Sequence, residues 1–249
     1  LSMAIRNGEL SLHYQPQASA GPTVAASQVI GFEALARWMH PVRGFVSPGD
    51  FIPLAEESGL IVEMGVWILR EACRQAASWP VPMQIAVNLS PAQFMHGDVV
   101  NLVHSILLET GLAPDRLELE ITEGVLIEDF DRGLALLRRL KALGVRISMD
   151  DFGSGYSSLS YLQAFPFDTI KIDRAFVMNL GRKPQSAAIV RAVIDLGHGL
   201  GMSIVAEGVE TQEQLGFLSA EGCDSVQGYF LGKPLPIGQY AALVGHSAI

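Results

Sequence analysis

The sequence lacks the features that mark secreted and membrane-spanning proteins. Its two cysteines, Cys73 and Cys223, are too few for a disulfide framework, and their separation matches no metal-binding spacing. No apolar run approaches the roughly 18 residues of a membrane span, and no signal-peptide pattern opens the chain. We therefore expect a cytoplasmic domain without membrane contact of its own, although a parent protein could be membrane-anchored.

Positive charge is also scarce. The 17 Lys and Arg residues are outnumbered by 26 Asp and Glu residues, which gives a formal net charge of -9. This balance argues against binding of duplex nucleic acid, which requires a basic surface. An acidic protein can still bind a phosphate ligand, provided that metal ions or a few placed cations offset the charge.

Short β-rich runs alternate with longer helical patterns along the 249 residues. The helical patterns include 61–79, 128–143 and 185–201, and the segments 17–27 and 39–53 are expected to be loops. This alternation predicts a mostly parallel sheet with helices outside it. The expected strands are 11–16, 28–36, 84–89, 116–121, 145–150, 168–173, 203–207 and 224–228.

Eight strands in this length favour a closed (β/α)8 barrel over an open doubly wound sheet. We expect residues 1–249 to form a single domain, because no low-complexity linker divides them. The first residue is Leu1 rather than Met, so we expect the domain to come from a longer multidomain protein.

Polar residues stand at the C-terminal ends of most predicted strands. In a barrel these ends meet on one face, where active sites lie. A single carboxylate at such a position can be a helix cap or a solvated loop residue, but the repetition at successive strands favours a functional cluster. Its members are Glu33, Asn88, Glu120, Asp150, Asp151, Lys171, Glu207 and Gln227.

The ligand types in this cluster indicate a metal. Five carboxylates cannot all stay ionised beside one lysine, and bound divalent cations resolve the conflict most simply. Oxygen donors without His or Cys favour Mg²⁺ or Mn²⁺ over Zn²⁺. The pair Asp150–Asp151 suits two metals that share a water of lowered pKa. Among such cations Lys171 would have a depressed pKa and could accept or relay a proton.

At this point the sequence resembles the EAL-domain proteins, bacterial phosphodiesterases that linearise cyclic di-GMP. The matching motifs occur in the family's order and span residues 14 to 230. They are Tyr14-Gln15-Pro16, Glu33-Ala34-Leu35 with Ala36 and Arg37, Asn88-Leu89-Ser90, Glu120-Ile121-Thr122-Glu123, Asp150-Asp151-Phe152-Gly153, Lys171-Ile172-Asp173, Glu207-Gly208-Val209-Glu210 and Gln227-Gly228-Tyr229.

The resemblance implies a modified (β/α)8 barrel whose first strand runs antiparallel to the others, with two Mg²⁺ or Mn²⁺ ions per site and inhibition by Ca²⁺. It assigns Glu33, Asn88, Glu120 and Asp150 as metal ligands, with Asp151 completing the second site. Glu207 and Gln227 are expected to hold metal-bound water or complete the ligand shell. Lys171 would orient or deprotonate the attacking water, and Glu123 would brace the loop 151–158.

The resemblance also suggests substrate contacts. Gln15 and Leu35 match positions that touch the nucleotide, and Arg37 can pair with a phosphate oxygen or, alternatively, with a barrel acid. Glu210 could accept from a guanine edge and Tyr229 could stack on a base, or either could be structural. Family members are expected to form homodimers, with the loop after Asp151 near the interface.

We therefore expect metal-dependent hydrolysis of cyclic di-GMP to linear pGpG, and loss of turnover when Glu33 or Lys171 is replaced by Ala. Two alternatives stay open. One is a catalytically silent module that binds cyclic di-GMP and signals its occupancy to a partner. The other is a metallophosphoesterase with another substrate, such as a linear dinucleotide, which the acidic cluster alone would allow.

Overall fold

The strands of the protein form one continuous sheet. A computed structural model of the chain describes residues 2–21, 28–96, 98–122, 129–153 and 159–246. Within these residues nine strands follow the order β1-β9-β8-β7-β6-β5-β4-β2-β3, and β1 also pairs with β2. Their bounds are β1 Leu10–Ser19, β2 Val29–His40, β3 Gly44–Val46, β4 Gln84–Asn88, β5 Leu117–Thr122, β6 Arg146–Phe152, β7 Thr169–Ile172, β8 Ser203–Ala206 and β9 Ser225–Gln227.

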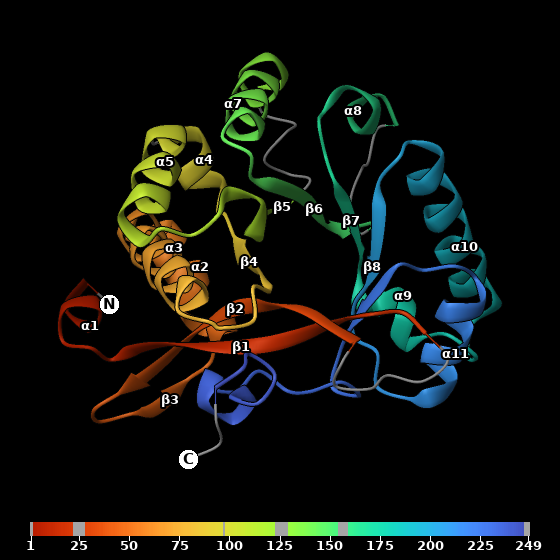
Figure 1. Cartoon of the computed structure of the whole chain (residues 1–249), viewed down its shortest axis with the longest axis horizontal. Coiled ribbons are helices and arrows are strands. Elements are labelled where there is room, and N and C mark those ends of the chain that lie inside the picture. Colours follow the sequence, from red (N-terminus) through yellow and green to blue (C-terminus); the bar gives the residue numbers. More distant parts are fainter. Residues whose placement is uncertain (1, 22–27, 97, 123–128, 154–158, 247–249) are drawn as a thin grey trace.

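The pairing of β1 with both β2 and β9 closes the sheet into a ring (Figure 1). Since β3 pairs only with β2, it lies outside the ring, and the other eight of the nine described strands form the barrel. Strand β1 runs antiparallel to both neighbours, whereas β2 and β4 to β9 run parallel to one another. This confirms the (β/α)8-type barrel and the antiparallel first strand.

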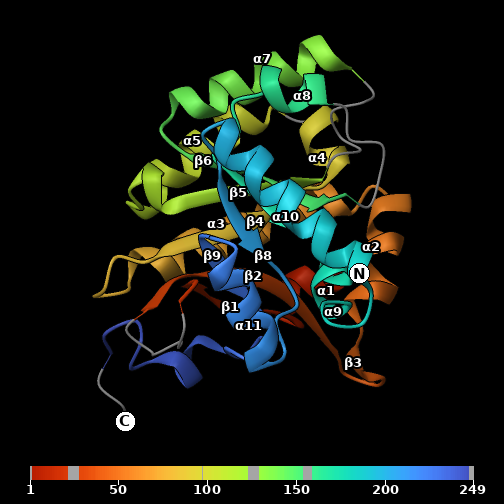
Figure 2. The same ribbon diagram turned by 90° about the vertical axis from the view of Figure 1, so that its right-hand side faces the viewer.

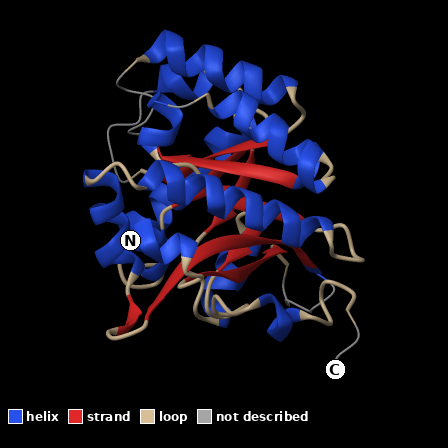
Figure 3. Ribbon diagram, turned by 90° about the vertical axis from the view of Figure 1, so that its left-hand side faces the viewer, coloured by secondary structure: helices blue, strands red, loops and turns tan. Residues whose placement is uncertain are grey.

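Helices surround the barrel on its outer side (Figures 2 and 3). The bounds are α1 Ser2–Arg6, α2 Pro48–Glu57, α3 Ile61–Ala77, α4 Pro91–His96, α5 Val99–Thr110, α7 Phe130–Ala142, α8 Leu159–Ala164, α9 Arg174–Met178, α10 Pro184–Gly199 and α11 Gln212–Ala220. The short 3-10 turns η2 and η3 cover Pro114–Arg116 and Ile237–Tyr240. No helix among the described residues is long and apolar enough to cross a membrane.

The predicted helix 61–79 is confirmed as α3, whose inner face buries Ile61, Gly65 and Ala72. The predicted loop 39–53 is wrong in part. It contains the end of β2, a turn at 41–43, strand β3, whose first residue Gly44 has a φ of 72°, and the start of α2. That helix begins at Pro48 because the fixed φ of proline suits a first helical position. On α7, which confirms the predicted helix 128–143, the buried leucines are Leu137 and Leu140, while Leu136 is only partly buried.

Candidate active site

The Lys171 ammonium lies at the centre of the strand-end carboxylates. The side chain is 1% exposed, and its Nζ is 2.6 Å from Glu207 Oε1 and 2.7 Å from Glu120 Oε1. Asp150 Oδ1 at 3.4 Å and Glu33 Oε2 at 3.8 Å complete the carboxylates around it. The predicted convergence of these strand ends is therefore observed, and we call these residues, together with Asp151, the acidic cluster.

Amide side chains orient Glu33 from two sides. Its Oε1 accepts a hydrogen bond from Asn88 Nδ2 at 2.7 Å, and its Oε2 accepts one from Gln227 Nε2 at 2.5 Å. Gln227 also donates to Gln15 Oε1 at 3.1 Å and accepts from Gln17 Nε2 at 2.9 Å. Sequence reasoning missed Gln17, although its spacing of two from Gln15 places both on one face of a strand.

Asp150 and Asp151 are consecutive, so a regular strand would point their side chains to opposite faces. The pairing of β6 with β7 shifts register between Met149 and Phe152. Asp151 has a φ of 54°, in the left-handed region that residues other than glycine rarely adopt. With this irregularity, ligand atoms of Asp150, Asp151 and Glu207 all lie within 4.8 Å of one another.

The electrostatics of the cluster are unbalanced. Burial and the neighbouring Glu33 raise the pKa of Glu120 well above its usual range, and Lys171 offsets this only in part. Both carboxylate oxygens of Glu120 are buried, and neither accepts a hydrogen bond within the described part of the chain, although the Lys171 ammonium lies 2.7 Å from Oε1. Burial also raises the pKa of Glu33, but Lys171 and the amide donors outweigh it and hold that pKa below its usual value.

Two further carboxylates hold protons more tightly than usual. Burial, together with Asp150, raises the pKa of Asp151 to about 6. Burial raises the pKa of Glu207 to about 7, although Lys171 opposes it. For Lys171 itself burial lowers the pKa, but the surrounding carboxylates outweigh burial and hold it well above its usual value. With carboxylates alone around it, Lys171 remains an ammonium. The depressed pKa expected for Lys171 beside bound cations stays a prediction.

The residues of the cluster can hold metal ions. Five carboxylates face one ammonium, that of Lys171, whose Nζ lies 2.7 Å from one of the buried oxygens of Glu120. The donors are carboxylate and amide oxygens, which suit hard divalent cations. Binding of such cations would supply the positive charge that Lys171 alone does not provide.

A cavity of about 590 Å³ opens onto the cluster. Its lining includes Glu33, Asp150, Glu207 and Gln227, and also the predicted substrate contacts Gln15, Leu35, Arg37, Glu210 and Tyr229. Five further lining residues lie outside the motifs that the sequence singled out, namely Pro48, Arg174, Ala175, Met178 and Pro234. Arg174 could have been found, because it directly follows the strand-end motif Lys171-Ile172-Asp173. The two prolines carry no comparable signal.

The candidate substrate contacts leave polar groups facing the cavity. Arg37 donates to the backbone carbonyl of Ala36 at 2.8 Å, and among the described residues it forms no ion pair with a barrel acid. Tyr229 is 58% exposed, and the Lys233 ammonium lies 5.5 Å from the centre of its ring. Glu210 is exposed at the rim. The remaining predicted residue, Glu123, lies outside the described residues, as does most of the loop that it was expected to brace.

The chain was compared with known protein families and curated sequences. The family model described as EAL domain matches residues 1–234. An uncharacterized signaling protein of Caulobacter vibrioides is 57% identical over 237 residues, which cover 95% of this chain and 29% of that protein. The bifunctional diguanylate cyclase/cyclic di-GMP phosphodiesterase MucR of Pseudomonas aeruginosa is 48% identical over 250 residues. That match covers 98% of this chain and 36% of MucR, so the chain spans about a third of these relatives.

Solved structures show the same similarity. The c-di-GMP complex of the PaMucR phosphodiesterase matches with a TM-score of 0.91 at 48% identity, covering 96% of this chain and 97% of that one. The EAL domain of Mycobacterium smegmatis DcpA matches with a TM-score of 0.81 at 37% identity, covering 94% of this chain and 97% of that one. Both similarities extend over nearly the whole barrel.

Proposed function

The chain belongs to the EAL domain family, and we propose that it hydrolyses one phosphodiester bond of cyclic di-GMP to linear pGpG with a 5′-phosphate. The observation that carries the proposal is the cavity in which the acidic cluster meets residues able to bind phosphate and base. The similarity to MucR, which is named as a cyclic di-GMP phosphodiesterase, supports this substrate.

We expect two Mg²⁺ or Mn²⁺ ions to be held by the acidic cluster. The ligands would be Glu33, Asn88, Glu120, Asp150 and Asp151, with Glu207 and Gln227 holding metal-bound water or completing the ligand shell. When bound, such ions supply positive charge for the reacting phosphate and lower the pKa of water. The hydrogen bonds from Asn88 and Gln227 hold Glu33 in a fixed orientation before any ligand arrives.

The protein's own groups are expected to place the substrate for in-line attack. The oxygen of a water attacks phosphorus, the bond from phosphorus to the 3′ oxygen breaks, and that oxygen gains a proton. The Lys171 ammonium can donate a hydrogen bond to orient the water and offset negative charge. The Arg37 guanidinium can pair with a phosphate oxygen. Glu210 and Tyr229 can bind the guanine edge and face at the rim.

Product analysis tests this proposal. The purified chain is incubated with cyclic di-GMP in Mg²⁺, Mn²⁺, Ca²⁺ or excess EDTA, and the nucleotides are separated. We expect pGpG with Mg²⁺ or Mn²⁺, and none with Ca²⁺ or EDTA. The variant Glu33→Ala should lose turnover, whereas Glu63→Ala, which removes an exposed carboxylate of α3, should keep it. Tight binding without product in Mg²⁺ and Mn²⁺ would favour a silent binding module.

We also propose that the domain acts in the cytoplasm as a homodimer. Its two cysteines are free and buried, which suits a reducing compartment. The dimer rests on the likeness to the family alone. Sedimentation velocity over a range of protein concentrations tests it, and a fully active, strictly monomeric chain would contradict it.

A further inference from the structure

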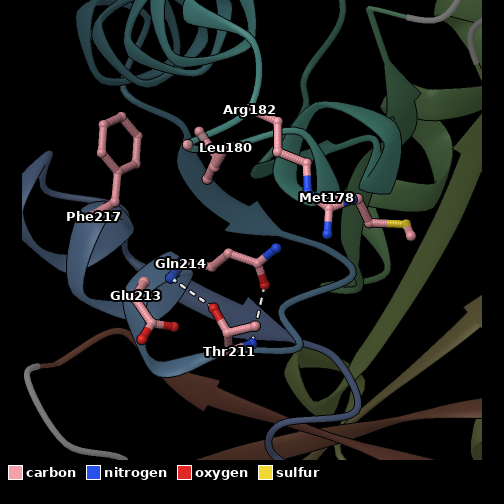
Figure 4. A pocket seen from close by; sticks show the side chains of 8 residues that line it. Met178, Leu180, Arg182, Thr211, Glu213, Gln214 and Phe217 are labelled. Atoms are coloured by element: carbon pink, nitrogen blue, oxygen red, sulfur yellow. Dashed lines mark hydrogen bonds between the residues drawn. The ribbon is translucent and has the colours of Figure 1, made fainter.

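The Gln214 side chain fixes the backbone beside Glu210. Gln214 lies in the first turn of α11 and is 9% exposed. Its Oε1 accepts hydrogen bonds from the backbone N–H of Glu210 at 2.7 Å and of Thr211 at 3.1 Å. In return, the backbone N–H of Gln214 donates to Thr211 Oγ1 at 3.3 Å, which completes a capping box. Figure 4 shows the contacts between Gln214 and Thr211.

The same carboxamide also contacts α9, a helix that contributes to the lining of the substrate cavity. Gln214 Nε2 donates to the backbone carbonyl of Val177 at 3.2 Å, and this bond is buried. Val177 belongs to α9, from which Arg174 and Met178 line the cavity. Met178 and Gln214 also line one neighbouring pocket of about 470 Å³ (Figure 4). One side chain therefore joins the β8–α11 loop to α9.

Other contacts fix the rest of this loop but not Glu210. Gly208 lies so close to α9 that a Cβ there would be 2.6 Å from Arg174 Cβ. The N–H of Val209 donates to the carbonyl of Gln227 at 3.0 Å. The Glu210 carboxylate makes no hydrogen bond or ion pair within the described residues, so its position depends on its backbone. The bond to Gln214 is the anchor closest to it.

We propose that Gln214 is a positioning residue that sets Glu210 against the α9 wall and thereby tunes affinity for the guanine base. The inference deepens the proposed function, because it rests on Glu210 binding the substrate. A capping box alone would stabilise α11 whatever the substrate. The bond to Val177 adds a second link, and a displaced Glu210 would weaken binding without altering the acidic cluster.

The principal test is a double-mutant cycle between Gln214→Met and Glu210→Ala, measured as kcat and KM with cyclic di-GMP in Mg²⁺. Methionine keeps the length of the side chain but removes its three hydrogen bonds. We expect Gln214→Met to raise KM by about 3- to 30-fold, with kcat within about twofold, as coupling between neighbouring residues allows. In the Glu210→Ala background the same change should raise KM by less than about twofold.

A second variant separates the helix cap from the link to α9. Gln214→Glu retains an acceptor for the N–H groups of Glu210 and Thr211 but cannot donate to Val177. We expect its Tm to stay within about 3 °C of the native value, while KM still rises. If Gln214→Met does not fold, the KM of Gln214→Glu tests the inference in its place. The matched control is Gln212→Met, an exposed glutamine of the same turn, which should keep the native KM.

Three outcomes would overturn the inference. The first is that Gln214→Met raises KM by the same factor in the native and the Glu210→Ala backgrounds, or that it lowers kcat and kcat/KM by the same factor. Either result indicates a general structural role. The second is a native KM for Gln214→Glu. The third is a Glu210→Ala variant with native KM and Kd, because Glu210 would then not bind substrate. If the native chain binds cyclic di-GMP without hydrolysing it, the proposed hydrolysis fails, and the same cycle is measured in Kd by calorimetry.

Discussion

The two ends of the barrel interior use the same strands for different purposes. Near the N-terminal ends, Glu118 Oε2 lies 3.1 Å from Arg146 Nε and accepts from Thr169 Oγ1 at 3.2 Å. Arg146 also donates to Thr169 Oγ1 at 3.3 Å, so charge and hydrogen bonds match in this layer. Two residues further along β5 and β7, Glu120 and Lys171 belong to the acidic cluster, where carboxylates are in excess. The first arrangement is neutral within itself, whereas the second has carboxylates in excess and can hold cations.

Acids just before two strands support the same contrast. Asp168 precedes β7 and accepts from the backbone N–H of Ile147 at 2.8 Å and from Lys141. Asp224 precedes β9 and accepts from the backbone N–H of Ile204 at 2.7 Å. These carboxylates join neighbouring strands and have their donors within the chain. The acids of the acidic cluster differ because they lie at the C-terminal face of the barrel and outnumber the one ammonium among them.

Replacing Lys171 should give the largest effect. We expect Lys171→Met to lower kcat by about 10²- to 10⁴-fold, the range for a group that handles a proton or orients water. In EDTA the variant should also be less stable, because the carboxylates lose their ammonium. Added Mg²⁺ should restore much of that stability by offsetting the same charge. Near-native kcat in steady-state assays would show that the ammonium is not needed for chemistry.

Breaking the opposite layer should reduce stability and spare catalysis. Glu118→Ala leaves the half-buried Arg146 without its carboxylate. We expect the free energy of unfolding to fall by about 2 kcal/mol, less than for a fully buried pair because Arg146 is partly solvated. Urea unfolding measures this loss, and kcat under stabilising conditions should stay within about twofold. A large fall in kcat would mean that the two layers are coupled and the contrast is false.

The smallest effect concerns pH. Because the pKa of Glu207 rises to about 7 in the fold from an ordinary 4.5, the native state retains a proton that the unfolded chain releases. Its stabilising contribution is present below the unfolded pKa and is lost as pH rises through about 7. Glu207→Gln stays neutral, so in EDTA its stability relative to native should grow by about 1 kcal/mol between about pH 5 and about pH 6. A pH-independent difference would contradict this.

Strand ends and spacing predicted much of the site. The positions of Glu33, Glu120 and Lys171 follow from period-two alternation and from parallel strands ending on one face. Alternation could not predict that Asp151 joins Asp150, because a register shift and a left-handed φ bring them together. The register shift and the left-handed φ depend on how β6 pairs with β7, which is a tertiary interaction rather than a local property of the sequence.

Sequence also says little about which groups line a cavity from loops and short helices. Gln214 looks like an ordinary helix cap until Val177 is placed opposite its amide. The family resemblance supplied the roles expected for Arg37, Glu210 and Tyr229, and the cavity places all three at its wall. Those roles remain predictions until substrate contacts are measured.

The antiparallel first strand has a consequence for synthesis on the ribosome. Closure of the ring joins Gln17 to Gln227 across 210 residues, and Gln227 reaches Glu33 across 194. The entropy cost of closing so long a loop is incurred late in synthesis, when nearly the whole barrel has emerged. A nascent chain that ends before β9 lacks both the closing strand and the amide that orients Glu33. Competence of the acidic cluster thus depends on complete translation of the barrel.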